Sequence, residues 1–307
     1  MGAANIQLGG ITLGWRNVWS RLAKTPSSNR DCRHARNLLR PFTRNTRVLL
    51  EGSRFCLEPC LERPLLDAIE RARLKRKASS AAHRIPLGLL LLSRQQISPE
   101  QLRAALDAQR DAGRGRLGEW LVCMGFTTEE KITAALARQW SCPILRTSSA
   151  LLQRNHIPQL PSTLLETFGM IPLDYVPSTA TLHIAFGGNL HHNVLYAIEK
   201  MTGSHTAPCI AGSNFVRASL QKLLAERSQR EIAFDTPFDA IECSRIIRSY
   251  CARLSTSEIR LVGCGAYIWA RLFQQPRPAM DIVFRAHVST EPGSQANLDS
   301  SPLPVRR

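Results

Sequence analysis

The sequence predicts an α+β fold in which a bundle of two tandem helical hairpins precedes small α/β domains. The first observation is a helical pattern that repeats at an offset of thirty residues. The second is the alternation of short apolar helix and strand patterns after this repeat. The third is the length of 307 residues with 44% hydrophobic side chains, which suits about two domains with buried cores.

Composition excludes several classes of protein. The longest apolar run, residues 85–92, is broken by Pro86 and Gly88 and is far shorter than the ~20 residues that cross a bilayer. The first ten residues lack a basic leader followed by an apolar core, so we do not expect a signal peptide. Nine cysteines spread along the chain are not typical of a secreted disulfide framework. We therefore expect a cytoplasmic protein without a transmembrane segment.

Basic side chains outnumber acidic ones by 40 to 24, which gives a net charge of +16. Residues 1–84 hold 17 basic and 6 acidic side chains, so a net +11 lies in this block. Such a block attracts polyanions of any kind. The alternative function is therefore a basic nucleic-acid-associated regulator that uses this block and an N-terminal zinc site. Arginine-rich composition alone is weak evidence for it, and nucleic acid is not the partner that we expect.

Changes in composition divide the chain into seven parts. The stretch RARLKRKASSAAHR is basic and then small, as in linkers, and the last residues are polar and proline-bearing. We predict a mobile N-terminal segment (1–30), a small cysteine-containing unit (31–70), a basic linker (71–84), a tandem-repeat helical domain (85–145), an α/β domain (146–230), a small α/β unit (236–290) and a disordered tail (291–307).

The cysteine-containing unit is the candidate metal centre. The segment RVLLEGSRFCLEPCLERPLLDAIERA resembles the second half of a small zinc-ribbon or treble-clef unit, in which a hairpin delivers one cysteine and a helix start delivers the next. The predicted zinc ligands are Cys32, His34, Cys56 and Cys60. The C-x-H and C-x3-C spacings are less specific than C-x2-C, so a decayed site with free thiols remains the alternative.

The repeat aligns Pro86–Gln109 with Arg116–Gln139 without a gap. In each copy a short helix begins at Leu-Gly and a second, capped helix follows. We expect capping boxes at Ser98, with Pro99 at the first helical position, and at Thr127. The second helices should bury one apolar face, formed by Leu102 and Leu106 in the first copy and by Ile132 and Leu136 in the second.

Two tandem copies of R-L-G-x2-L-x3-G-x6-L-x3-L-x2-Q resemble the MshE-type N-terminal domain of type II secretion and type IV pilus assembly ATPases. In that family the tandem motif binds cyclic di-GMP, so the resemblance implies this ligand and a partner in the secretion or pilus machinery. The second copy has Arg116, Leu117, Gly118, Leu121, Gly125, Ile132, Leu136 and Gln139. The first copy has Leu87, Gly88, Leu91, Leu102, Leu106 and Gln109, but Pro86 replaces the arginine and Gln95 the glycine.

These residue types suit a guanine nucleotide. Arginine stacks on guanine, glutamine or arginine can hydrogen-bond its edge, glycine lets the backbone approach a phosphate, and leucine covers the base. Loss of the arginine from the first copy removes a charge-assisted contact, so binding should depend mainly on the second copy. Arg84 and Arg114 are candidates to replace it.

The resemblance extends over about residues 85–225. It includes an α/β segment with predicted helices at 161–168, 189–201 and 213–224 and strands at 170–175, 181–186 and 206–210. Within the segment, the His191-His192 pair lacks neighbouring ligands and is interpreted as a solvated helix start. The C-terminal unit predicts helices at 238–254 and 266–273 and strands at 258–262 and 280–288.

The sequence contains no Gly-Lys pair and hence no Walker A loop, G-x4-G-K-[ST], to cradle nucleotide phosphates. We also find no general acid/base or nucleophile pair. We therefore predict a non-enzymatic binding protein of secretion or pilus machinery, located in the cytoplasm or at the periphery of the inner membrane.

Overall fold

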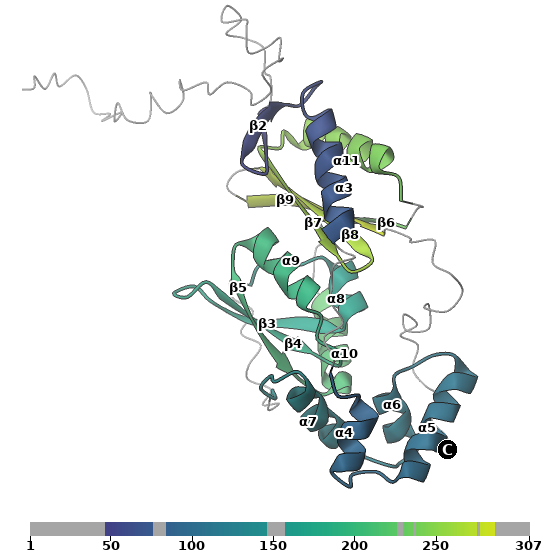
Figure 1. Ribbon diagram of the computed structural model, residues 1–307. Coiled ribbons are helices and arrows are strands. Elements are labelled where there is room, and N and C mark those ends of the chain that lie inside the picture. Colours follow the sequence, from purple (N-terminus) through teal and green to yellow (C-terminus); the bar gives the residue numbers. More distant parts are fainter. Residues whose placement is uncertain are drawn as a thin grey trace, which may run out of the picture.

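The computed structural model describes residues 47–75, 84–145, 157–225, 230–235, 238–274 and 277–285. They form three parts that are stacked along the molecule (Figure 1). A six-stranded sheet with two helices lies at one end, a three-stranded α/β unit lies in the middle, and the helical repeat lies at the other end. Among the described helices, none has the length and apolar character required to cross a membrane.

The repeat domain consists of two helical hairpins, as predicted. The first copy forms α4 (Leu87–Ser93) and α5 (Pro99–Ala112), and the second forms α6 (Leu117–Cys123) and α7 (Glu129–Gln139). Ser98 caps α5 in a reciprocal capping box with Gln101, which confirms that prediction. The cap of α7 is Thr128 and not Thr127; Thr128 is the residue thirty after Ser98, whereas Thr127 is buried at the position that matches Ile97.

The α/β unit follows the predicted order of elements. It comprises α8 (Ser162–Phe168), β3 (Met170–Val176), β4 (Thr181–Phe186), α9 (His192–Thr202), β5 (His205–Ile210) and α10 (Ser213–Ala225). In its sheet, β4 lies between β3, which is antiparallel, and β5, which is parallel. Gly203 ends α9 with φ +73°, a left-handed conformation that glycine adopts readily.

The remaining strands form one sheet of order β2-β1-β7-β8-β9-β6. It contains β1 (Arg47–Leu50), β2 (Ser53–Cys56), β6 (Glu231–Phe234), β7 (Glu258–Cys264), β8 (Tyr267–Gln274) and β9 (Arg277–Arg285). Helices α3 (Glu62–Lys75) and α11 (Ala240–Leu254) cover one face, and the other face packs on the α/β unit.

This sheet corrects the division of the chain made from sequence. Residues 31–70 and 236–290 were expected to form separate units, but β1 pairs in parallel with β7. The hairpin β1–β2 has apolar side chains, Val48 and Leu50, that a two-stranded ribbon alone cannot bury. It therefore adds to the edge of the larger sheet. In addition, α3 continues to Lys75, beyond the expected start of the linker.

The predicted helix at 266–273 is wrong, because this segment is strand β8. Trp269 packs in the core shared with the α/β unit, whereas Ile268 and Ala270 pack beneath α3 and α11. A strand that is buried on both faces shows no alternation of apolar and polar residues, so periodicity alone cannot distinguish it from a buried helix.

Candidate functional site

A cavity of about 940 Å³ lies where the repeat domain, the α/β unit and the six-stranded sheet meet. Its lining includes eight residues that the tandem motif predicts as ligand-binding: Leu87, Gln109, Arg116, Leu117, Gly118, Ile132, Leu136 and Gln139. Six of these belong to the second copy and two to the first. The other predicted residues, Gly88, Leu91, Leu102, Leu106, Leu121 and Gly125, are not among the residues that line it.

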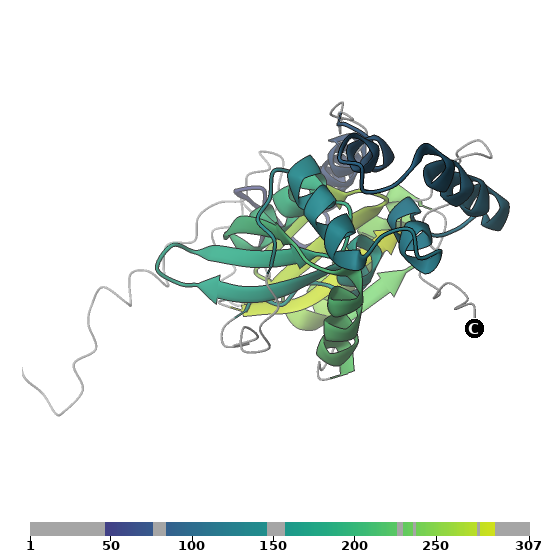
Figure 2. The same ribbon diagram turned by 90° about the horizontal axis from the view of Figure 1, so that it is seen from below.

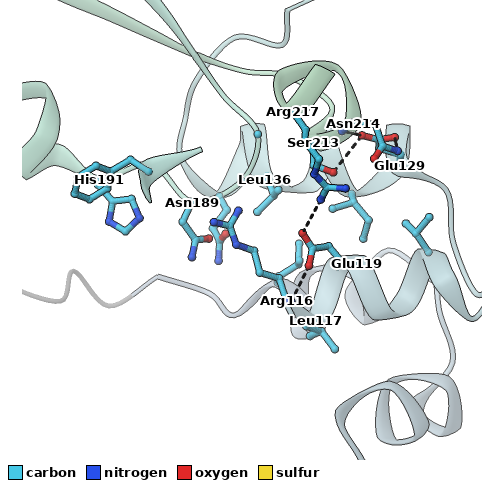
Figure 3. A pocket seen from close by; sticks show the side chains of 18 of the residues that line it. Arg116, Leu117, Glu119, Glu129, Leu136, Asn189, His191, Ser213, Asn214 and Arg217 are labelled. Atoms are coloured by element: carbon cyan, nitrogen blue, oxygen red, sulfur yellow. Dashed lines mark hydrogen bonds and ion pairs between the residues drawn. The ribbon is translucent and has the colours of Figure 1, made fainter. Parts of the chain in front are cut away.

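Arg116 is the main cationic group of the cavity. It occupies the N-cap position of α6, and its side chain extends toward the loop after β4, near Asn189 (Figure 3). A β-carbon at position 188 would meet Arg116 Nη1, so a larger residue there would displace the guanidinium from this position. Within the described part of the chain, the Arg116 guanidinium makes no ion pair. Its charge is therefore available to an anionic or guanine ligand.

Two glutamates of the second copy contact α10 on another side of the cavity. Glu119 accepts a hydrogen bond from the Arg116 backbone N–H at 3.0 Å and lies 3.8 Å from Arg217 on α10. Glu129 accepts hydrogen bonds from the N–H of Asn214 at 2.8 Å, from its Nδ2 at 2.7 Å and from Ser213 Oγ at 3.2 Å. These contacts, drawn as dashed lines in Figure 3, fix the second copy to the N-terminal end of α10.

The two motif glutamines make matched hydrogen bonds within the repeat. Gln109 Nε2 of the first copy donates to Gly115 O at 2.8 Å, at the start of the second copy. Gln139 Nε2 of the second copy donates to Ile85 O at 2.7 Å, at the start of the first. Each amide nitrogen uses one of its two N–H groups in this bond, so the second N–H and the carbonyl Oε1 of each glutamine can still serve a ligand.

The motif glycines serve the packing and the turns of the repeat. A β-carbon at Gly88 would lie 2.8 Å from Leu102 Cδ1, and one at Gly118 would lie 3.0 Å from Ile132 Cγ2. Gly125 ends α6 with φ +73° and open space around it, and Gln95 adopts φ +54° at the matching position. Close helix packing and a left-handed turn thus account for these glycines.

Neither Arg84 nor Arg114 takes the place of the arginine that the first copy lacks. The Arg84 guanidinium carbon lies 3.8 Å from the centre of the Trp140 ring, and its Nη2 is 3.0 Å from His192 Nε2. Neither Arg84 nor Arg114 is among the lining residues. The cavity is therefore asymmetric, although the repeat that forms it is nearly symmetric.

His191 belongs to the cavity, in addition to starting a helix as expected. It caps α9, and its ring centre lies 5.1 Å from that of Phe168. Although its side chain is exposed, surrounding protein displaces enough water to lower its pKa below the usual 6.5, and the positive charges of Arg116 and His192 lower it further. Sequence reasoning missed this part of the cavity. The Gly187-Gly188 pair between β4 and α9, which also lines the cavity, was the signal that could have indicated it.

The predicted zinc site has no support in the described residues. Cys56 ends β2 and Cys60 precedes α3, and both thiols are buried beside Phe55. Cys32 and His34 lie outside the described residues. In the described ranges, no group of three or more histidine, cysteine or acidic side chains is placed to hold a metal ion. The segment forms part of a larger sheet, and a separate zinc-ribbon unit is not confirmed.

Comparisons with known proteins concern only part of the chain. No family model matches it. The type IV pilus assembly ATPase PilB of Myxococcus xanthus (strain DK1622) is 24% identical over 141 residues, which are 46% of this chain and 24% of PilB. The chain therefore spans about a quarter of the length of this curated relative.

Solved structures similar to this chain include that of MshE with cdg (cyclic di-GMP), at 27% identity and a TM-score of 0.39. The match covers 45% of this chain and 99% of that one. The N-terminal domain of XpsE is 15% identical, with a TM-score of 0.33, and the match covers 44% of this chain and 92% of that domain. The match to PilB agrees with the resemblance inferred from the tandem repeat: part of this chain is similar in sequence to part of a type IV pilus assembly ATPase.

Proposed function

We propose that the cavity binds cyclic di-GMP and that the chain is a non-enzymatic regulatory protein of a type II secretion or type IV pilus system. The observation that carries the proposal is the Arg116 guanidinium, which has no ion-pair partner among the described residues and lies with seven other motif residues around one cavity. The volume of about 940 Å³ is within the range of roughly 300–1,000 Å³ that small-molecule sites occupy.

The chemistry of the lining matches that of a guanine dinucleotide. An arginine can form two hydrogen bonds to guanine O6 and N7 or pair with a phosphate. Guanine also has N–H donors. The carboxylate of Glu119 and the Oε1 atoms of Gln109 and Gln139 can accept hydrogen bonds from them. Leu117 and Ile132 supply apolar surface for a base. Arg217, which lies 3.8 Å from Glu119, is a second positively charged residue in the lining for a dianionic ligand.

The known relatives support the same ligand and setting. MshE was solved with cdg, and PilB is a type IV pilus assembly ATPase. The 307 residues of this chain contain no Walker A loop, so the role that we propose is to sense the nucleotide and pass the signal to a machinery protein in the cytoplasm or at the inner membrane.

Calorimetric titration of the full chain with cyclic di-GMP tests this function. Arg116→Ala should weaken binding at least ten-fold, because a hydrogen bond to a charged group contributes about 1.5–3 kcal/mol. The matched control is Arg110→Ala on α5, whose side chain is 77% exposed and pairs only with Asp107 among the described residues; this variant should bind as wild type does.

Thermal unfolding should be nearly unchanged in both variants. If Arg116→Ala binds cyclic di-GMP as tightly as wild type, or if wild type does not bind it, the receptor function is overturned and the repeat is a scaffold for a protein partner.

A further inference from the structure

One wall of the cavity comes from outside the segment that resembles the secretion ATPases. That segment spans about residues 85–225, whereas Ala266 and Tyr267 also line the cavity and belong to the six-stranded sheet. Ala266 lies in the tight turn between β7 and β8, and Tyr267 is the first residue of β8, where it pairs with Cys264. The ligand cavity is thus completed by a part of the chain to which the motif gives no role.

The position of this turn is tightly determined. Gly265 adopts φ +58°, and a β-carbon there would lie 3.0 Å from Phe168 Cζ, so the turn packs directly against the end of α8. The Tyr267 hydroxyl is hydrogen-bonded to Thr167 Oγ1 at 3.1 Å. Thr167 Oγ1 in turn donates to the Thr163 carbonyl at 2.7 Å, within α8. Tyr267 therefore ties the turn to the helix that borders the same cavity.

Further contacts attach the same sheet to the α/β unit and cross-link its strands. Glu231 at the start of β6 accepts hydrogen bonds from the backbone N–H groups of Ser162 and Thr163, at 2.6 and 3.1 Å. The buried Arg271 pairs with Asp281 at 2.7 Å. Trp269 is fully buried in the core that the sheet shares with the α/β unit. The turn is thus the end of a sheet that is packed and hydrogen-bonded to the α/β unit at several places.

We propose that the cavity is a composite ligand site in which the β7–β8 turn contacts the cyclic dinucleotide directly. Ala266 limits the space available to the ligand on this side of the cavity. Tyr267 is a positioning residue, because its hydrogen bond to Thr167 keeps the turn next to α8. The six-stranded sheet then senses whether the cavity is filled. This proposal rests on the proposed function, because it takes cyclic di-GMP as the occupant.

The test uses the full chain and cyclic di-GMP. Ala266 is exposed at the turn, so Ala266→Trp should fill part of the cavity and weaken binding at least ten-fold without lowering the unfolding temperature. The control is Ala252→Trp, at an exposed position of α11 in the same sheet unit, which should leave binding unchanged. In wild type, hydrogen exchange in residues 264–268 should slow when the ligand is added.

Tyr267→Phe provides a second variant in case the tryptophan disturbs folding. It keeps the ring but loses the hydroxyl, and it should weaken binding several-fold and reduce the ligand-dependent protection of the turn. If wild type binds, Arg116→Ala loses binding and Ala266→Trp binds as wild type does, the composite site is overturned while the receptor function stands. If wild type does not bind cyclic di-GMP, both proposals are overturned.

Discussion

The two copies of the repeat have the same local fold but different surroundings. Residues 91–97 and 121–127 show the same order of buried and exposed positions, and both copies have a side-chain cap at the start of the second helix. Yet Leu136 of the second copy is 8% exposed, whereas Leu106, at the matching position of the first, is 40% exposed. The expected burial of Leu106 in a core is therefore corrected.

The difference follows from which copy touches the α/β unit. Helix α7 packs near β5 and is fixed to α10 by Glu129, whereas α5 lies at the outer edge of the molecule in both views (Figure 2). The second copy also has Arg116, where the first has Pro86. A sequence repeat thus determines a repeated fold, while contact with the next unit determines which copy forms the cavity.

The largest effect should separate the two matched leucines. Leu136→Ala removes a buried side chain and should lower the free energy of unfolding by about 2–4 kcal/mol. Leu106→Ala should cost less than about 1 kcal/mol, because much of that side chain is already in water. Urea unfolding of both variants measures the difference, and equal losses would show that the two copies are buried alike.

A second matched pair tests the attachment to α10. Glu129→Ala removes three hydrogen bonds to Ser213 and Asn214 and should lower the free energy of unfolding by about 1–3 kcal/mol. Pro99 occupies the matching position on α5, so Pro99→Ala is the control and should cost less, up to about 1 kcal/mol, because it loses only the restraint that proline places on the unfolded chain. Calorimetric unfolding of the two variants checks this, and a neutral Glu129→Ala would contradict the idea that Glu129 fixes the second copy.

The smallest effect concerns the turn within each copy. Gly125 and Gln95 share a left-handed conformation, with φ of +73° and +54°, which costs a residue other than glycine roughly 1–2 kcal/mol. Gly125→Gln should therefore destabilise the protein by about 1 kcal/mol, and Gln95→Gly should stabilise it by up to about 1 kcal/mol. Changes in unfolding temperature of the same sign in both variants would argue against a shared turn.

Much of the fold can be predicted from local sequence. The offset of thirty residues, the cap at Ser98 and the strand and helix order between Pro161 and Leu224 depend on interactions within a few turns of the chain, and these predictions agree with the structure. The predicted cap of α7 was wrong by one residue. Adding the repeat offset of thirty to Ser98 gives Thr128, the residue that caps the helix.

What the sequence did not predict depends on contacts between distant segments. Burial on both faces removes the alternation from β8, and the pairing of Leu49 with Glu258 joins segments that are far apart along the chain. For the same reason the motif identifies Arg116 but gives no signal for Arg217 or Ala266, which reach the cavity only through the packing of three units.

The paired glutamine bonds have a consequence for how such a repeat can exist. Gln109 donates a hydrogen bond to the backbone carbonyl at the start of the second copy, and Gln139 donates one to the backbone carbonyl at the start of the first. Each hairpin therefore supplies a donor for a carbonyl of the other. A single hairpin cut from the chain would leave its glutamine amide without its acceptor. Two identical hairpins on separate chains would, however, satisfy each other in the same way, as a symmetric homodimer. The same two bonds thus make the second copy a requirement of the first, since each hairpin supplies a hydrogen-bond acceptor at its start and a donor at its end that only a neighbouring hairpin can match.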